Sequence, residues 1–279
     1  MKVAIQGGKA SFHDIATLNY FGAEAETICC PTFREVCDRL KSQEADFALM
    51  AIENSIAGSI LGNYSLIREY GFKIIGEIQL RIEMNLIALP GVQIDDIKKV
   101  RSHYMALLQC EQFLANYPHI KVEEYHDTAD SVRDIKLKEQ HSVAAIAGRY
   151  AAKLYDMEIV AEGIETEKKN FTRFMVLSAE KKPKVEESEK ATLCFQLPNK
   201  VGALASLLKV IVDNNINLTK IQSIPILGKP DEYTFYVDCE WANYSDFKKS
   251  IEVKSFVNEL TILGEYKKGR TIYDYSNSN

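Results

Sequence analysis

The sequence predicts an α/β protein with largely parallel sheets, followed by a smaller β-α-β-β-α-β unit. Short apolar runs alternate with helical periods over the first two-thirds of the chain, a pattern typical of parallel sheets. A highly charged stretch with one proline, residues 180–190, then interrupts this alternation. The elements beyond it follow the split βαβ, ferredoxin-like order.

The first part of the chain is expected to form two lobes. Strands are predicted at 2–6, 27–30, 47–52, 122–125, 143–147 and 175–177, and helices at 11–21, 33–42, 60–70, 105–116, 129–139 and 149–155. Residues 72–89 are β-rich and nearly twice as long as a usual strand, which suggests a bend or a crossing between lobes. With a second passage near residue 165, this predicts a cleft, the default place for a ligand.

The second part is expected to begin after a solvated linker of mixed charge. Strands are predicted at 191–197, 218–226, 233–240 and 261–266, helices at 202–214 and 246–259, and a turn at 228–231. We therefore predict a first domain at residues 1–180, a linker at 181–190 and a second domain at 191–279.

Composition excludes several classes of function. A net charge of −5 argues against nucleic acid and against an anionic membrane surface as partners. No segment approaches the roughly 20 apolar residues of a membrane span. The six cysteines and five histidines show no metal-type spacing, so no metal is expected. Cys29 and Cys30 are neighbours, which disfavours a disulfide between them, and a reduced, cytoplasmic setting fits best.

Polar side chains recur where predicted strands lead into helices. In α/β sheets such strand ends are where ligands bind, although each of these residues also fits a turn or a helix cap. The four junctions are Gln6 to Ser11; Glu53-Asn54-Ser55 with Gly58; Ser102-His103 with Gln109 further along the helix; and His126-Asp127-Thr128.

The segment Asn170-Phe171-Thr172-Arg173-Phe174 is the most informative in the chain. A hydroxyl and a guanidinium stand side by side before an apolar strand, and arginine can bind a carboxylate through two parallel hydrogen bonds. Strand alternation would send Thr172 and Phe174 to one face and Arg173 to the other, so either the strand begins after Arg173 or Arg173 is structural.

These elements together resemble the prephenate dehydratases that carry a C-terminal ACT regulatory domain. The family's Glu-Asn-Ser/Thr-x-x-Gly element stands at 53–58, its Ser-His-Pro…Gln-Cys element at 102–110, and its Asn-x-Thr-Arg-Phe signature at 170–174. The first loop departs from the family pattern, with Ala10 in place of a glycine and His13 in place of a serine. The resemblance implies a two-lobed, periplasmic-binding-protein-like catalytic part and a ferredoxin-like ACT domain.

The resemblance also implies the reaction and its residues. A prephenate dehydratase of phenylalanine biosynthesis would convert prephenate to phenylpyruvate, water and carbon dioxide, and would need no cofactor. Thr172 would donate a hydrogen bond to the departing oxygen, Asn54, Ser55 and Gln109 would orient the substrate, and Arg173 would supply positive charge. The remaining predicted substrate contacts are Ser11, Ser102, His103 and Phe174.

In the second domain, the resemblance implies an amino-acid effector, phenylalanine, bound by Gly202-Ala203-Leu204 and by Gln222-Ser223. The family's Glu-Ser-Arg-Pro element reads Gln222-Ser223-Ile224-Pro225 here, which removes two charges, so an ACT domain kept for dimerisation with weakened regulation is the alternative. A homo-oligomer, dimer or tetramer, is expected.

Two other functions stay open at this point. An arogenate dehydratase would act on the substrate that carries an amino group on its side chain, and assays of both substrates would separate the two. A non-catalytic amino-acid-binding regulator predicts saturable binding without turnover.

Overall fold

The computed structural model describes residues 1–180, 187–226, 228–229, 231–252, 257 and 259–273. The chain divides into two compact units, one of residues 1–60, 78–174 and 271–279, the other of residues 61–77 and 175–270. Residues 61–77 thus group with the C-terminal elements, which the chain order alone does not indicate. Residues 181–186 of the predicted linker lie outside the described residues.

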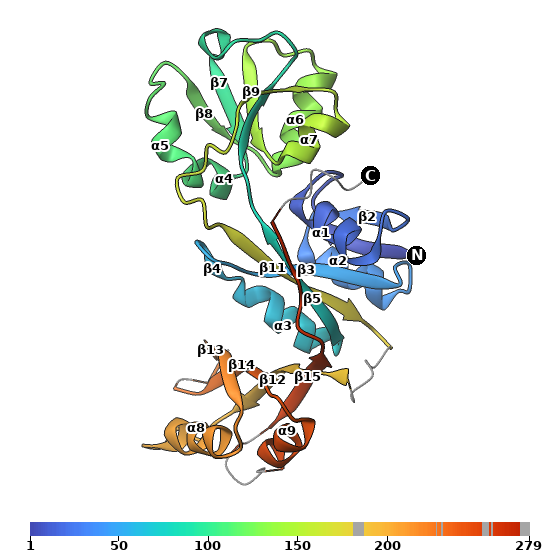
Figure 1. The fold of residues 1–279 in the computed structure, drawn as a ribbon, viewed down its shortest axis with the longest axis vertical. Helices are drawn as coiled ribbons and strands as arrows, with labels where there is room; N and C mark the ends of the chain where they lie inside the picture. Colours follow the sequence, from blue (N-terminus) through green and yellow to red (C-terminus); the bar gives the residue numbers. More distant parts are fainter. Residues whose placement is uncertain (181–186, 227, 230, 253–256, 258, 274–279) are drawn as a thin grey trace. The chain divides into compact units, whose positions relative to one another are not determined.

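A seven-stranded sheet contains the N-terminus of the chain (Figure 1). Its strand order is β16-β5-β11-β3-β1-β2, with the short β4 paired to β3. The strands are β1 (Lys2–Gln6), β2 (Glu26–Cys30), β3 (Phe47–Asn54), β4 (Gly58–Ser59), β5 (Lys73–Arg81), β11 (Phe171–Ser178) and β16 (Thr271–Ile272). Strand β1 lies parallel to both β2 and β3, which places their carboxyl ends at one edge. Helices α1 (Phe12–Phe21) and α2 (Phe33–Lys41) connect these strands.

A five-stranded sheet forms the second lobe of the first unit, with the order β10-β6-β9-β7-β8. Its strands are β6 (Asn85–Ala88), β7 (Lys99–Ser102), β8 (Lys121–Glu124), β9 (Val143–Ala147) and β10 (Glu158–Ala161). Its helices are the 3-10 helix η1 (Ile94–Asp96) and α4 (Tyr104–Gln109), α5 (Glu111–Leu114), α6 (Thr128–Leu137) and α7 (Arg149–Leu154). The chain enters this lobe after β5 and leaves it before β11, as the two predicted crossings require.

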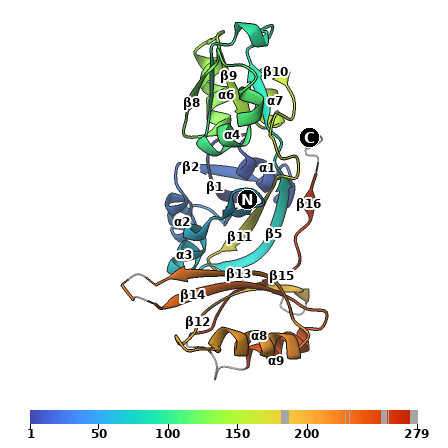
Figure 2. The ribbon, with the colours of Figure 1, turned by 90° about the vertical axis from the view of Figure 1, so that its left-hand side faces the viewer.

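The second unit contains a βαββαβ arrangement, as the sequence predicts. Its elements are β12 (Lys190–Gln196), α8 (Ala203–Asp213), β13 (Asn217–Pro225), β14 (Tyr233–Glu240), α9 (Tyr244–Ile251) and β15 (Thr261–Tyr266). The strands pair antiparallel in the order β13-β14-β12-β15. Helices α8 and α9 lie together on one side of this sheet (Figure 2), where Trp241 stacks on Phe247 with ring centroids 4.0 Å apart.

Helix α3 (Leu61–Tyr70) belongs to the same unit and contacts the other face of this sheet. The rings of Tyr64 and Tyr236 are 5.1 Å apart, and Arg68 Nη2 lies 3.0 Å from Glu259 Oε2. Strand alternation explains the two faces, because Tyr236 and Val237 are neighbours in β14 and must point in opposite directions.

Several predicted boundaries were wrong for identifiable reasons. The predicted strand at 175–177 begins at Phe171, so Thr172 and Arg173 lie inside β11 rather than ahead of it. The predicted helix at 105–116 is two short helices with Cys110 between them. The second lobe is a mixed sheet, because β6 pairs antiparallel with β9 and with β10. Helix α9 ends at Ile251, and residues 253–256 and 258 of its predicted extent lie outside the described residues.

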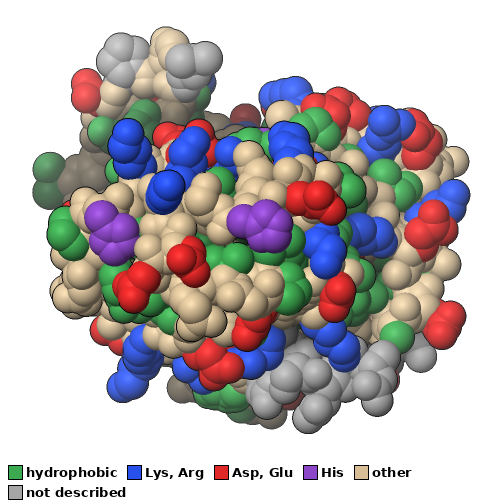
Figure 3. Space-filling model, turned by 90° about the horizontal axis from the view of Figure 1, so that it is seen from above, with side chains coloured by type: hydrophobic (Ala, Val, Ile, Leu, Met, Phe, Trp, Pro, Cys, Tyr) green, Lys and Arg blue, Asp and Glu red, His purple; other side chains and the backbone are tan. Residues whose placement is uncertain are grey.

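The surface carries charge of both signs. In the face drawn in Figure 3, Lys and Arg side chains alternate with Asp and Glu, and neither sign gathers into one broad patch. None of the helices in the described part of the chain has the length and apolar character needed to cross a membrane.

Candidate active site

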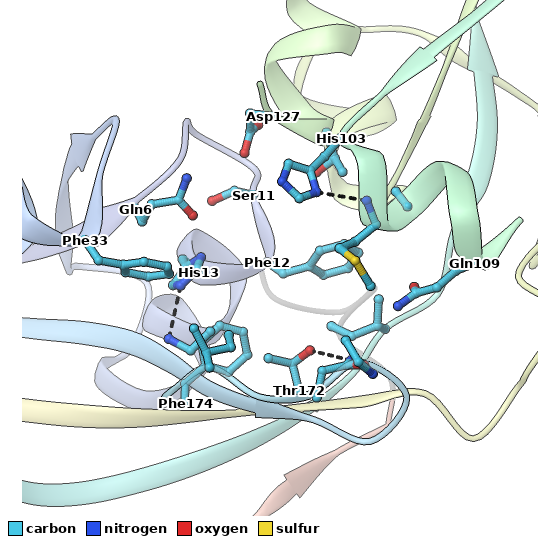
Figure 4. Close-up of a pocket in the computed structure, with 18 of the residues that line it drawn as sticks. Gln6, Ser11, Phe12, His13, Phe33, His103, Gln109, Asp127, Thr172 and Phe174 are labelled. Carbon is cyan, nitrogen blue, oxygen red and sulfur yellow. Dashed lines mark hydrogen bonds between the residues drawn. The ribbon is translucent and has the colours of Figure 1, made fainter. Parts of the chain in front are cut away.

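A cavity of about 650 Å³ lies between the two lobes of the first unit (Figure 4). Both lobes contribute to its wall, and so does β11, which carries Thr172 and Phe174 into it. Of the predicted substrate residues, six line this cavity: Ser11, Asn54, His103, Gln109, Thr172 and Phe174. Residues from distant parts of the sequence therefore meet at one place.

Much of the wall is aromatic or aliphatic. Phe12, Phe33 and Phe174 project into the cavity in Figure 4, and Ile82, Met84 and Met105 also line it. A wall of this kind suits a six-membered carbon ring and keeps bulk water away from it.

Helix N-termini supply the positive potential of the cavity. The caps Ser11 of α1, Thr32 of α2 and Asp127 of α6 all line it, together with the first residues of these helices. Free backbone N–H groups and the helix dipole attract anions at such ends. Among the described lining residues none is Lys or Arg, so an anionic ligand would depend on these helix ends.

Asn54 and Thr172 are joined by a hydrogen bond at the end of the cavity nearest β11. Asn54 Nδ2 donates to Thr172 Oγ1 at 3.0 Å and to Asn170 Oδ1 at 2.7 Å. The other amide atom, Asn54 Oδ1, accepts from the backbone N–H groups of Ile56 at 2.9 Å and Ala57 at 2.8 Å. These bonds fix the side-chain orientation, because only Nδ2 can then face Thr172.

Asn170 connects this network to the second lobe. Its Nδ2 donates to Gln109 Oε1 at 2.9 Å, and the residue is fully buried. Asn170 belongs to the signature at 170–174 but was not among the predicted site residues. A buried asparagine amide needs partners on both sides, and here they are two of the predicted site residues.

Three predicted substrate residues do not line the cavity. Arg173 points away from it, because β11 alternates and Thr172 faces inward; its Nη1 lies 3.9 Å from Glu53 Oε2. Ser55 instead ties β11 to the turn after β3, accepting from Phe171 N at 2.9 Å and donating to Lys169 O at 3.0 Å. Ser102 is fully buried and donates to Ile146 O at 2.6 Å. In this structure the hydroxyls of Ser55 and Ser102 bond to backbone groups, and the Arg173 side chain lies near Glu53.

In the first loop, Ala10 takes the backbone conformation of a glycine. This residue has a φ of +63°, in the left-handed region that glycine adopts without strain. Its backbone N–H donates to Asp14 Oδ2 at 2.7 Å, which holds the loop against the start of α1. Ser11 at the same place caps α1, its Oγ accepting from Asp14 N at 3.3 Å.

His13 lines the cavity and was not predicted as a site residue. Burial lowers its pKa from 6.5 to about 3, so the imidazole is neutral. Nε2 accepts from Ala51 N at 3.2 Å, and the ring contacts those of Phe33 and Phe174 at centroid distances of 5.5 and 5.0 Å. The only sign of His13 in the sequence was that it stands where the family has a serine.

Asp127 is the one carboxylate among the described lining residues. It caps α6, with Oδ1 accepting from Asp130 N at 2.9 Å, and only 9% of the residue is exposed. Burial raises the pKa of this carboxyl. The sequence predicted that Asp127 or Thr128 caps this helix, and Asp127 does. It did not place Asp127 in the site.

The predicted effector residues lie in the second unit. Gly202 has a φ of +83° and precedes α8, where Ala203 and Leu204 form the first turn. Gln222 and Ser223 lie in β13, an edge strand. In the described residues, no group of three or more His, Cys, Asp or Glu side chains could hold a metal ion.

Comparison with known proteins identifies the class. Residues 3–182 match the family model for prephenate dehydratase, and the chain belongs to the prephenate dehydratase family. The bifunctional chorismate mutase/prephenate dehydratase of Aquifex aeolicus is 35% identical over 96% of this chain and 74% of its own. Arogenate dehydratase 5 of Arabidopsis thaliana is 33% identical over 95% of this chain and 67% of its own.

Two solved structures are similar over nearly the whole chain. One, described as GqqA, a novel type of quorum quenching acylase, has a TM-score of 0.86 and 26% identity, covering 96% of this chain and 98% of its own. The other is a prephenate dehydratase from Arthrobacter aurescens in complex with L-Phe, with a TM-score of 0.84, 26% identity and coverage of 96% and 90%.

Proposed function

We propose that this chain converts prephenate to phenylpyruvate, water and carbon dioxide in phenylalanine biosynthesis. The observation that carries the proposal is the hydrogen bond from Asn54 Nδ2 to Thr172 Oγ1 inside a largely apolar cavity ringed by helix N-termini. The hydrogen-bonded Thr172, the apolar wall and the helix N-termini would each contribute to one step of the reaction.

The substrate is a dianion whose ring loses a hydroxide from one carbon and a carboxylate, as carbon dioxide, from the opposite carbon. The N-termini of α1, α2 and α6 would hold the carboxylates through backbone N–H groups. The aromatic wall would enclose the ring and favour the loss of charge that accompanies decarboxylation.

Thr172 would act at the departing oxygen. Since Thr172 Oγ1 accepts from Asn54, its own O–H is directed elsewhere and can donate to the leaving hydroxide. A donor that is already polarised by a second hydrogen bond donates more strongly. Hydroxide leaves as carbon dioxide is lost and the ring becomes aromatic, and one proton from solvent completes the water molecule.

Gln109 and Asn170 would position this donor and the ring. Gln109 lines the cavity from the second lobe and accepts from Asn170, which in turn accepts from Asn54. A substrate that contacts Gln109 between the lobes would therefore affect the Asn54–Thr172 pair through these hydrogen bonds.

The surroundings of Thr172 do not support its use as the nucleophile of an acylase, the activity named in the description of one similar structure. A hydroxyl nucleophile needs a base within hydrogen-bond reach, and the neighbour of Thr172 is an amide donor that cannot take its proton. Incubating the purified chain with prephenate and following phenylpyruvate tests the proposed activity; saturable binding without any product would favour a non-catalytic regulator instead.

We further propose that residues 1–180 are the catalytic domain and that residues 191–279 are an ACT regulatory domain acting in a cytoplasmic homo-oligomer, a dimer or a tetramer. Phenylalanine would bind at Gly202-Ala203-Leu204 with Gln222 and Ser223, since Gly202 leaves the N-terminus of an 11-residue helix open to a carboxylate. The complex of the Arthrobacter aurescens relative with L-Phe supports this effector. Calorimetric titration with phenylalanine tests effector binding, and light scattering tests the oligomeric state. A titration without heat of binding would mean that the ACT domain serves dimerisation only.

A further inference from the structure

We infer that Glu165 is a positioning residue of the reaction proposed above. Its buried carboxylate holds the two chain crossings between the lobes together and thereby fixes Gln109 in the cavity wall. The inference rests on the proposed dehydratase function. Glu165 itself does not line the cavity, so its effect on the substrate must pass through Gln109.

Glu165 is a buried carboxylate in the segment that leads out of the second lobe. Its side chain has an exposed fraction of 0%, and Lys168 Nζ lies 3.9 Å from Oε1, beyond hydrogen-bond distance. Among the described residues, no group donates a hydrogen bond to that oxygen. Burying a carboxylate with an incomplete set of donors is unfavourable for folding. Stability alone therefore does not account for a glutamate at this place.

The other carboxylate oxygen joins the two crossings. Glu165 Oε2 accepts from Met84 N at 2.9 Å, and Met84 O accepts in turn from Ile164 N at 2.8 Å. Met84 belongs to the crossing between β5 and β6, and Glu165 to the crossing between β10 and β11. Without the carboxylate the buried Met84 N–H would lose its acceptor, and an unpaired buried donor is costly enough to displace the segment.

The segment that carries Glu165 also holds Gln109. Thr166 N donates to Gln109 O at 2.9 Å, and Asn170 Nδ2 donates to Gln109 Oε1 at 2.9 Å. Cys110, the residue after Gln109, lies within the electrostatic reach of Glu165: burial and, to a lesser extent, the charge of Glu165 raise the pKa of the Cys110 thiol to about 12. A displacement of Glu165 would therefore move Gln109 in the cavity wall.

Three substitutions of Glu165 separate its contact from its charge. Alanine offers no acceptor to Met84 N, and aspartate is one methylene too short to keep the contact from the same backbone position. Glutamine keeps the length and an oxygen acceptor, so Glu165→Gln should preserve the contact without the charge. Glu167→Ala is the matched control, because Glu167 is an exposed carboxylate of the same segment that does not line the cavity.

We expect KM for prephenate to rise about tenfold in Glu165→Ala and Glu165→Asp, and to stay within about threefold of the wild type in Glu165→Gln and Glu167→Ala. The fall in kcat should be smaller than the rise in KM, because Thr172 keeps its own partner Asn54. Circular dichroism shows which variants are folded, and Glu165→Asp carries the comparison if Glu165→Ala does not fold.

A double-substitution cycle distinguishes positioning from a general effect on the fold. If Glu165 acts through Gln109, the protein that carries both Glu165→Asp and Gln109→Ala should have a KM within about threefold of that of Gln109→Ala alone. If Glu165 only supports the fold, the two single effects on KM should multiply.

Four results would overturn the role of Glu165 while the dehydratase stands: a wild-type KM in folded Glu165→Asp, multiplying effects in the cycle, a Glu165→Gln variant as impaired as Glu165→Asp, or loss of folding in both Glu165→Ala and Glu165→Asp. A wild type that forms no phenylpyruvate from prephenate would instead refute the dehydratase function, and this role with it.

Discussion

Asn54 Nδ2 donates to Thr172 Oγ1 across a distance of 3.0 Å, joining residues 118 positions apart in the chain. Asn54 is itself held from behind by two backbone N–H groups, of Ile56 and Ala57. Asn54 thus orients the Thr172 hydroxyl and leaves the hydrogen of that hydroxyl free to donate to a ligand in the cavity. The residues around this pair can be tested one at a time.

Replacing Asn54 by aspartate should abolish turnover while the fold persists. The new carboxylate would still accept from the Ile56 and Ala57 amides, but it would offer no donor to Thr172 and would bring a negative charge to the departing hydroxide. We expect kcat to fall by about 10²-fold or more. Circular dichroism and kcat on prephenate check this; an Asn54→Asp variant with near-normal kcat would show that Thr172 needs no such partner.

Replacing Arg173 by glutamine should change KM by no more than about threefold, because its side chain lies on the face of β11 opposite the cavity. Gln109→Ala is the comparison, since Gln109 lines the cavity and its loss is expected to raise KM about tenfold. Steady-state kinetics give KM for both variants and the wild type. A large rise in KM for Arg173→Gln alone would restore the substrate role that the sequence suggested.

His13 should make the protein less stable as the pH falls. The unfolded imidazole takes up a proton near pH 6.5, whereas the folded one resists protonation because its pKa is lowered to about 3. The unfolded state therefore binds more protons in this window, and stability falls with decreasing pH by up to about 1.4 kcal/mol per unit from this group.

His13→Gln isolates that contribution, because a glutamine oxygen can still accept from Ala51 N. Urea unfolding between about pH 6.5 and 4 should show a shallower loss of stability in the variant than in the wild type. Parallel losses in the two proteins would mean that His13 is not a neutral buried group.

Most of the order of elements and the convergence of several polar residues could be predicted from the sequence, but the strands β10 and β16 were not predicted. Apolar runs such as 47–52 and 143–147 are buried strands, and β-strand alternation already opposed Thr172 to Arg173. The start of β11 could not be predicted, because Asn170 and Thr172 are polar and resemble loop residues. Their hydrogen-bond partners lie in β3 and α4, far away in the chain.

The roles of single polar residues were harder to predict than their location. Ser55 and Ser102 stand at the expected strand ends, yet their hydroxyls bond to backbone carbonyls of neighbouring segments. A serine can satisfy a backbone group or a ligand equally well, and only the tertiary contacts decide. His13 and Asp127 were missed as site residues for the same reason, since each also completes local structure.

The most direct test of the Thr172 hydroxyl is to compare kcat of Thr172→Ala with kcat of Thr172→Ser at saturating substrate. This comparison shows whether the hydroxyl assists the departing oxygen. Serine keeps the hydroxyl and should retain turnover within about tenfold, whereas alanine should lose it by about 10³-fold or more with the fold intact. A Thr172→Ala variant with near wild-type kcat would show that the hydroxyl has no part in the reaction.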